Sequence, residues 1–351
     1  MKAARPATRT VGRSRDVYAV GEARAGECRE GRGAGKAEAK EARLRLESSM
    51  NLERCLTIVA AVLAVCASSA RAQDLGPHVR KIKEGIYVQS AREVNSTSGV
   101  ILTQEGVVII DTGQTPIDSR EVMDTVRKLT PSPVRLVINT EVHPDHTTGN
   151  FVFSPPALVI NAAGAAEAMR RAFDPERPNA LAKESPEMRD AVQGYRLVTP
   201  HIEYHDKTTV HVGERTFELL HFKNVHSEAD TAVWLPNERV LFAASVAIPN
   251  SINNLRPFVS IPEMLAAIKT MKSLNPEIVV PGHGSFGTTK IFDDSQRYYE
   301  LLLERVGVMV REGKSLDQIK RELRMPEYAS WSYQERMPTN IEAAYRAVKG
   351  N

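Results

Sequence analysis

The sequence has little cysteine, and all of it lies in one part of the chain. Of the 351 residues only three are cysteines, Cys28, Cys55 and Cys66, and each falls within the first 72 positions. The rest of the chain therefore has neither a disulfide nor a thiolate ligand. All nine histidines lie in that cysteine-free part, so any metal bound there must be held by imidazole and carboxylate groups.

The sequence also lacks a hydrophobic run long enough to cross a membrane, which takes about 20 residues. Its longest apolar run, Leu56–Ala67, follows a short charged segment that starts at Met50 and precedes an Ala-x-Ala site. This order is typical of a signal peptide. We therefore predict a signal peptide over residues 50–72, cleavage after Ala72, and a periplasmic or secreted protein. A buried core helix and a lipid-anchored Cys66 are the alternatives.

Residues 1–49 have little to bury and show no sustained strand or helix period. We expect this segment to be disordered, or to lie upstream of a true start at Met50, because a signal peptide normally opens the chain. The first 72 residues hold 14 of the 46 Lys and Arg but 8 of the 43 Asp and Glu. The rest is therefore slightly acidic, and the overall charge of +3 is no evidence for a nucleic-acid partner.

From Ile86 onward, short β-rich runs alternate with helical periods. The expected strands are Ile86–Gln89, Gly99–Thr103, Val107–Ile110, Val134–Asn139, Leu158–Ile160, a hairpin over Thr208–His221, a hairpin of Thr231–Leu235 with Val240–Ala243, and Glu277–Val280. The expected helices are Ile117–Leu129, Ala162–Phe173, Pro262–Leu274 and most of the chain after Ile291, with a mixed segment over Asp174–Pro200. This alternation predicts a single α/β domain over residues 73–351.

Four potential ligands occur within six residues, in the segment Glu141-Val142-His143-Pro144-Asp145-His146. Glu141 and His143 are two apart and would share one face of an extended stretch. Asp145 and His146 would turn over its end toward a second position, and a bound ion gives a reason for that turn. The spacing predicts a dinuclear zinc site with a carboxylate where an imidazole is expected. A surface turn with unconnected histidines is the alternative.

Together with other residues, this segment resembles the metallo-β-lactamase superfamily over about Ile86 to His283. The matching landmarks, in order, are the strand-ending Asp111, the cluster Glu141/His143/Asp145/His146, His226, Ser245 after Leu-Phe-Ala-Ala, and His283 in Pro-Gly-His-Gly. The resemblance implies a four-layer αβ/βα sandwich with the metal site at one edge, between the two sheets.

The resemblance also implies the ligands of the two zinc sites. One site would be formed by Glu141, His143 and His226, and the other by Asp145, His146 and His283. A hydroxide held by the metals would be the nucleophile, and Asp145 would also orient it. Asp111 is expected to support the ligand loop by a hydrogen bond, or else only to form a turn, and for Asp230 the two roles are evenly balanced. Many relatives have a bridging Asp or a ligating Cys where this chain has Ser245, which we expect to hold water or a ligand rather than zinc.

These features imply an exported, zinc-dependent hydrolase that opens an amide or ester bond of a small molecule. The missing bridging Asp argues against a glyoxalase-II-like thioesterase, and the missing Cys against the cysteine-ligating lactamases. The cysteine-free third subclass remains, with a β-lactam as the expected substrate. The alternatives are a lactonase, a hydrolase similar to those associated with periplasmic quinoprotein oxidation, and a metal-binding accessory protein without activity.

For the residues around this centre our expectations are less specific. Loops at Arg92–Ser98 and Asp174–Pro200 are expected to set substrate specificity. Lys223 and Asn224 are either contacts for an anionic substrate group or solvated loop residues. The histidines outside the landmarks are expected to be surface or core residues; they are His78, His201, His205, His211 and His221.

Overall fold

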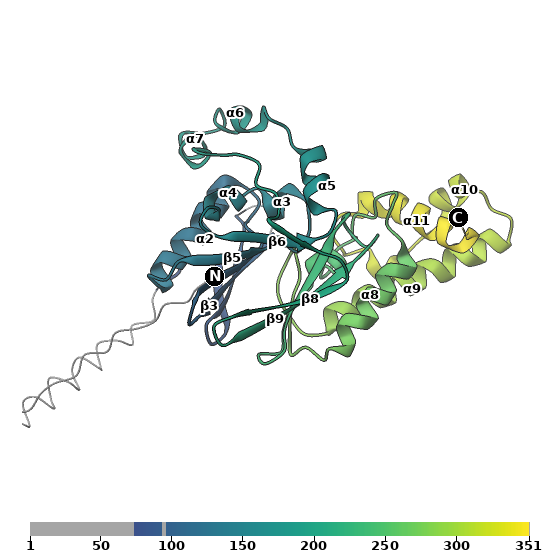
Figure 1. Cartoon of the computed structure of the whole chain (residues 1–351). Coiled ribbons are helices and arrows are strands. Elements are labelled where there is room, and N and C mark those ends of the chain that lie inside the picture. Colours follow the sequence, from purple (N-terminus) through teal and green to yellow (C-terminus); the bar gives the residue numbers. More distant parts are fainter. Residues whose placement is uncertain (1–73, 93–95, 351) are drawn as a thin grey trace, which may run out of the picture. The chain divides into compact units, whose positions relative to one another are not determined.

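The computed structural model describes residues 74–92 and 96–350 (Figure 1). The expected signal peptide over 50–72 and the expected disorder of 1–49 therefore lie outside the described residues. Residues Gln73–Asn351 form one compact unit. None of the helices in the described ranges has both the length and the hydrophobicity needed to cross a bilayer.

The first sheet has seven strands in sequential order from β1 to β7. Its strands are β1 (Val79–Lys83), β2 (Ile86–Ser90), β3 (Thr97–Thr103), β4 (Gly106–Ile110), β5 (Val134–Ile138), β6 (Leu158–Ala162) and β7 (Ile202–Tyr204). The first four strands pair antiparallel, whereas β4, β5, β6 and β7 run parallel.

The second sheet has five strands in the order β12-β11-β10-β9-β8. Its strands are β8 (Lys207–Val212), β9 (Arg215–Phe222), β10 (Asp230–Leu235), β11 (Val240–Phe242) and β12 (Ile278–Val280). Strands β8 to β11 form antiparallel hairpins, and β12 pairs parallel with β11.

Side chains on β4 show how the layers are built. Val108 and Ile110 pack into a core shared with residues of the second sheet, such as Phe217. Val107 and Ile109 point to the opposite face and pack with Val122 of a covering helix. Successive strand residues face opposite sides of a sheet, so a strand of four consecutive apolar residues must be covered on both faces. The inner core therefore lies between the two sheets.

Helices cover the two outer faces (Figure 1). The helices of the described part of the chain are α2 (Pro116–Leu129), α3 (Pro144–Thr147), α4 (Asn150–Phe153), α5 (Ala165–Ala172), α6 (Arg177–Leu181), α7 (Pro186–Ala191), α8 (Ile261–Ser273), α9 (Lys290–Arg311), α10 (Leu316–Glu322) and α11 (Met337–Lys349), with 3₁₀ turns η1 (Ala244–Val246), η2 (Pro326–Tyr328) and η3 (Gln334–Arg336). Helix α2 packs on the first sheet, and α8, α9 and α11 pack on the second. This order confirms the four-layer αβ/βα sandwich.

The start of α2 illustrates how the local sequence sets an element. Thr115 accepts a bond from the backbone of Asp118, and the Asp118 carboxylate accepts one from the backbone of Thr115. This capping box, followed by Pro116, stabilises the helix start by about 1 kcal/mol. The helix accordingly begins one residue before the expected Ile117.

Three sequence predictions differ from the structure. The expected helix over Ala162–Phe173 begins only at Ala165, because Ala162 pairs with Tyr204 as the end of β6 and Gly164 takes a left-handed conformation (φ 96°). Strands β1 and β7 were not predicted. Both are short edge strands, and Val79–Lys83 carries three charged side chains that obscure its period.

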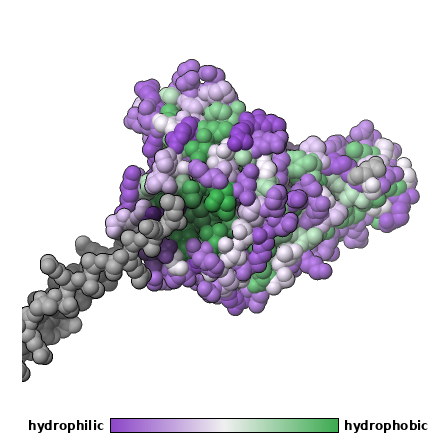
Figure 2. Space-filling view, in the orientation of Figure 1, coloured by the Kyte–Doolittle hydropathy of each residue, from purple (hydrophilic) through white to green (hydrophobic). Residues whose placement is uncertain are grey.

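The face seen in Figure 2 is largely hydrophilic, with hydrophobic residues gathered in a hollow near the middle of the globular part.

Several strand ends meet at one edge of the sandwich. They are the carboxyl ends of β4, β5, β11 and β12 and the beginning of β10. Loops at such an edge can carry polar groups without disturbing the core, and every landmark residue lies there or just beyond it.

Candidate metal centre

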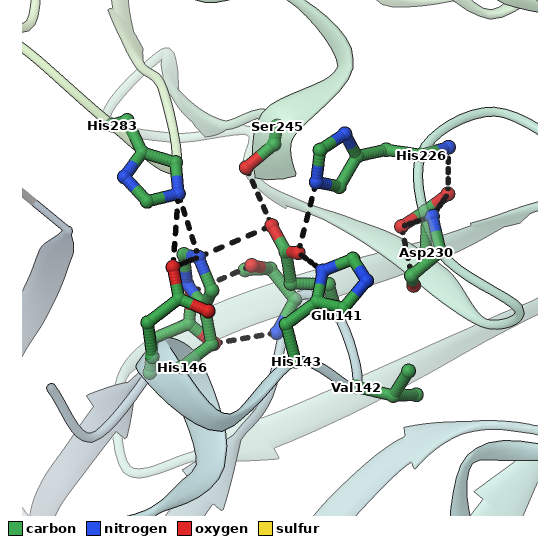
Figure 3. A network of polar contacts seen from close by, with 12 residues as sticks. Glu141, Val142, His143, His146, His226, Asp230, Ser245 and His283 are labelled. Atoms are coloured by element: carbon green, nitrogen blue, oxygen red, sulfur yellow. Dashed lines mark hydrogen bonds and ion pairs between the residues drawn. The ribbon is translucent and has the colours of Figure 1, made fainter. Parts of the chain in front are cut away.

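The ligand-rich segment is a bend followed by a very short helix. Strand β5 ends at Ile138, and α3 begins at Pro144, whose fixed φ suits the first helical position. Glu141 and His143 therefore precede the helix, whereas Asp145 and His146 lie in its first turn. Figure 3 shows how Glu141, His143 and His146 meet His226 and His283, which come from loops of the second sheet.

Two groups of three candidate ligands form at this edge. We call Glu141, His143 and His226 the first triad, and Asp145, His146 and His283 the second triad. Within each triad, one potential ligand atom from each residue lies within 4.8 Å of the others. The structure thus brings together the same two sets that the sequence resemblance implied, while their role as metal ligands stays a prediction. The other five histidines belong to no such group in the described ranges.

Glu141 lies between the two triads and faces both. Its Oε2 is 3.3 Å from His226 Nε2 and also contacts His143 Nδ1, whereas its Oε1 is 3.2 Å from His146 Nε2. The side chain is fully buried. One carboxylate therefore offers an oxygen to each position (Figure 3).

Asp111 supports the ligand loop and the second triad. It accepts hydrogen bonds from the backbone of Thr140 (2.7 Å) and from His146 Nδ1 (2.9 Å). The first fixes the residue before Glu141, and the second directs the other ring nitrogen of His146 toward His283. Asp111 has a left-handed backbone (φ 52°), a conformation that Asp tolerates better than most residues.

Asp230 supports the loop of the first triad. It begins β10, and its carboxylate accepts bonds from the backbone of His226 (2.7 Å) and from both the backbone and the hydroxyl of Ser227. Burial, followed by the nearby charge of Glu141, raises the pKa of Asp230 to about 7. Asp230 thus holds the loop that carries His226.

Ser245 contacts the side chain of a candidate ligand, Glu141, rather than a candidate metal position. Its hydroxyl donates to Glu141 Oε1 at 2.5 Å, and its backbone carbonyl accepts a bond from Asn253 (2.7 Å). A Cβ on Gly282 would lie 2.5 Å from the same hydroxyl, so glycine is required beside His283. Where many relatives carry a bridging Asp, this chain thus has a hydroxyl that holds the carboxylate of Glu141.

The charges of the centre depend on one another. Burial raises the pKa of Glu141, but its three histidine neighbours together hold that pKa well below the usual range. Burial lowers the pKa of His146, yet the carboxylates of Glu141, Asp111 and Asp145 raise it to about 10. With no metal, a proton on His146 therefore balances part of the negative charge of the centre.

The donor atoms fit a cation. Because Asp111 accepts the bond from Nδ1 of His146, release of the other ring proton leaves the lone pair of Nε2 directed inward. That atom lies 3.2 Å from His283 Nε2 and 3.5 Å from Asp145 Oδ2. A cation bound there would replace that proton as the positive charge that pairs with the surrounding carboxylates. Imidazole with carboxylate is also a donor set that suits zinc.

A cavity of about 230 Å³ adjoins both triads. Its lining residues in segments 248–256 and 333–336 were not predicted from the sequence, and none of the described residues of the two expected loops lines it. The exposed Lys223 and Asn224 do not line it. Part of the 174–200 loop instead lines a second pocket beside Pro144 and Thr147.

Comparison with known sequences gives relatives of several activities. A linear primary-alkylsulfatase of Pseudomonas sp. (strain ATCC 19151) is 24% identical over 220 residues, which cover 53% of this chain and 40% of the relative. The alpha subunit of a 2,4-dinitroanisole O-demethylase of Nocardioides sp. (strain JS1661) is 26% identical over 195 residues, 53% of each chain. This chain thus spans about half the length of the curated relatives it matches.

Solved structures share the fold. A stereoselective inverting sec-alkylsulfatase of Pseudomonas sp. superposes with a TM-score of 0.62 at 19% identity, covering 76% of this chain and 49% of that one. A metallo-beta-lactamase of Pontibacter korlensis gives a TM-score of 0.50 at 21% identity, covering 62% of this chain and 96% of that one. At these identities the likeness extends to the fold alone.

The matched part of the chain contains the whole candidate centre. The sequence profile of the metallo-beta-lactamase superfamily matches residues 91–283, from just before β3 to the histidine after β12. Both triads, Asp111 and Ser245 lie inside this range. The chain belongs to the metallo-beta-lactamase superfamily.

Proposed function

We propose that this protein is an exported, zinc-dependent hydrolase. The observation that carries the proposal is the convergence of two ligand triads beside one cavity. Three protein ligands per ion leave coordination positions for water and substrate, which is the pattern of catalytic rather than structural zinc sites.

The residues divide into holding and reacting groups. The first triad would hold one zinc ion and the second triad the other, with Glu141 facing both. When bound, zinc lowers the pKa of its water toward neutrality and polarises the bond to be cleaved. Asp145 lines the cavity and its side chain is 27% exposed, with Oδ2 at 3.2 Å from His283 Nε2. We assign to its other oxygen the role of orienting the attacking water and accepting a proton.

A β-lactam ring is the first candidate substrate, because residues 73–351 contain no cysteine and position 245 is a serine. An alkyl sulfate is the second, favoured by a curated relative and a solved structure that are both alkylsulfatases. Water attack cleaves a C–N bond in the first and a C–O or S–O bond in the second. Both reactions need the same activated water.

A substrate panel tests the proposal. The zinc-loaded protein is assayed with a chromogenic cephalosporin, a neutral lactone and a linear alkyl sulfate, beside the chelator-treated protein. We expect turnover of the cephalosporin or the alkyl sulfate that chelator abolishes and zinc restores. A protein that binds two zinc ions but turns over none of the three would instead support a metal-binding accessory role.

Export is the remaining part of the proposal, and it rests on the signal-peptide pattern of residues 50–72. Expression of the full chain with its own leader, followed by sequencing of the secreted product, tests it. We expect a mature protein that begins at Gln73. A product confined to the cytoplasm and still containing Met50 would contradict export.

A further inference from the structure

The cavity beside the metal centre has one wall of candidate ligands and one wall of quite different residues. His143, Asp145, His226 and His283 form the first wall. The remaining lining residues outside the ligand segments, which we call the second wall, are Ile248, Ser251, Asn253, Asn254, Arg256, Tyr333 and Arg336. A molecule held against the second wall would therefore lie directly beside the metal centre.

Arg256 is the first of two arginines in this wall. It is half-buried, and one of its N–H groups donates to the backbone carbonyl of His226 at 3.1 Å. A guanidinium has five N–H donors, so most of its hydrogen-bonding capacity is left over. This bond ties the arginine to the loop that carries a candidate ligand.

Arg336 is the second, and it comes from outside the part of the chain that matches the superfamily profile. It donates to the carbonyl of Ile252 at 3.2 Å, and its guanidinium carbon lies 3.7 Å from the ring centre of Tyr333. Stacking of this kind fixes the plane of a guanidinium. Tyr333 is itself in a left-handed conformation (φ 63°), and its half-exposed ring lines the cavity.

The arginines are not neutralised by neighbouring acids. Across residues 74–92 and 96–350, neither Arg256 nor Arg336 is in an ion pair with a carboxylate. Among the described residues that line the cavity, the only acidic one is Asp145, which belongs to the second triad. Two half-buried cations held by backbone carbonyls form a positive wall, and guanidinium groups match the geometry of carboxylate and sulfate oxygens.

We propose that Arg256 and Arg336 form an anion-binding subsite that selects substrates carrying an oxyanion, either a carboxylate or a sulfate. The proposal rests on the proposed hydrolase function and narrows its substrates, since a neutral lactone lacks such a group. Tyr333 holds Arg336 in place and offers an aromatic face to the rest of the substrate.

Ligands that cannot be hydrolysed test the subsite by binding alone. Octanesulfonate represents the sulfate and octanoate the carboxylate, and the neutral methyl octyl sulfone and octanamide are their matched partners. Binding to the zinc-loaded protein is measured by calorimetry for the wild type, for Arg256→Met, for Arg336→Met and for the double variant. Arg311→Met, an exposed residue in the last turn of α9, is the control.

We expect each single variant to weaken binding of at least one anion roughly tenfold, since hydrogen bonds to charged groups contribute on the order of 1.5–3 kcal/mol. Binding of the neutral partners should stay unchanged, as should all binding to Arg311→Met. Weaker binding of octanesulfonate alone would favour an alkyl sulfate as the substrate. Weaker binding of octanoate alone would favour a substrate with a carboxylate, such as a β-lactam.

Unchanged anion binding in the double variant, or an equal loss for neutral and anionic partners, would overturn the subsite. Because both arginines bind backbone carbonyls, Arg256→Lys and Arg336→Lys serve as second variants that keep the charge, and zinc content is measured for every protein. Failure of the hydrolase proposal would show differently, as full zinc content without turnover of any substrate.

Discussion

The two triads differ in how their histidines are held. In the second triad, the carboxylate of Asp111 accepts a bond from the far nitrogen of His146. In the first triad, the corresponding Nδ1 of His226 is buried and has no hydrogen-bond partner in the described part of the chain. A carboxylate on the far nitrogen orients a ligating ring and raises its basicity. We therefore expect the second triad to bind zinc more tightly than the first.

Their carboxylates differ as well. Glu141 of the first triad is completely buried and surrounded by histidines, whereas Asp145 of the second is 27% exposed at the cavity wall. A buried charge with several fixed partners serves to hold cations, and an accessible one can also meet substrate and water. We therefore assign to Glu141 the role of holding cations and to Asp145 the role of meeting substrate and water.

The largest expected effect is on turnover in Asp145→Asn. Loss of the group that orients and deprotonates water should lower kcat by between about 10² and 10⁴. Zinc content should fall by much less, since His146 and His283 remain. Metal analysis and kinetics on the same preparation check this, with the exposed Asp124→Asn on α2 as the control. Equal losses of zinc and turnover would show that Asp145 is a ligand only.

Glu141→Gln should have the next largest effect, on zinc affinity. Removing one partner from a buried group of paired charges costs about 3–5 kcal/mol, so affinity should fall at least about a hundredfold. Because Glu141 faces both triads, both binding steps should weaken, whereas His226→Ala should weaken only one. Competition with a chromophoric chelator measures the two steps. A loss confined to the weaker step, which we assign to the first triad, would argue against a shared carboxylate.

Asp111→Asn sharpens the contrast between the triads. The amide keeps the size of the side chain but no longer offers a charged acceptor to His146. Loss of such a partner typically weakens metal binding by about 10- to 100-fold, and here the tighter step should be the one affected. The same chelator competition decides the matter. If instead the weaker step changes, the assignment of the tighter step to the second triad is wrong.

Ser245→Ala should have the smallest effect. It removes the 2.5 Å bond to Glu141 Oε1 while both triads keep all their ligands. We expect zinc affinity to drop by roughly tenfold or less, in line with a single hydrogen bond to a charged group. Ser273→Ala, at the exposed end of α8, is the matched control. A loss as large as that in Glu141→Gln would mean that the hydroxyl itself binds zinc.

Much of the fold could be predicted because its central strands carry a strong local signal. The apolar run Val107–Ile110 has to be buried on both faces wherever it lies in the chain. Edge strands lack that signal: Val79–Lys83 is half polar, and Ile202–Tyr204 is only three residues long. The end of β6 was missed because alanine is a good helix former, and pairing with Tyr204 overrides that preference.

In the candidate centre, too, the local features could be predicted from the sequence and the tertiary contacts could not. Glu141 to His146 are neighbours in sequence, so their spacing alone predicted a shared site, and the resemblance supplied His226 and His283. The contact between Glu141 and Ser245 could not be predicted, because it spans 104 residues of sequence. Arg336 was missed for the same reason, as the bond to Ile252 that brings it to the cavity depends on tertiary packing.

A zinc titration of the metal-free protein by calorimetry tests the central claim most directly. We expect two zinc ions to bind in two separable steps, with the tighter step absent in His146→Ala. The tighter step should release protons at neutral pH, because the pKa of His146 is raised to about 10 before zinc binds. Measurement in two buffers of different ionisation enthalpy gives the proton count. A folded protein that takes up no zinc, or whose zinc uptake is unchanged in His146→Ala, would contradict the account.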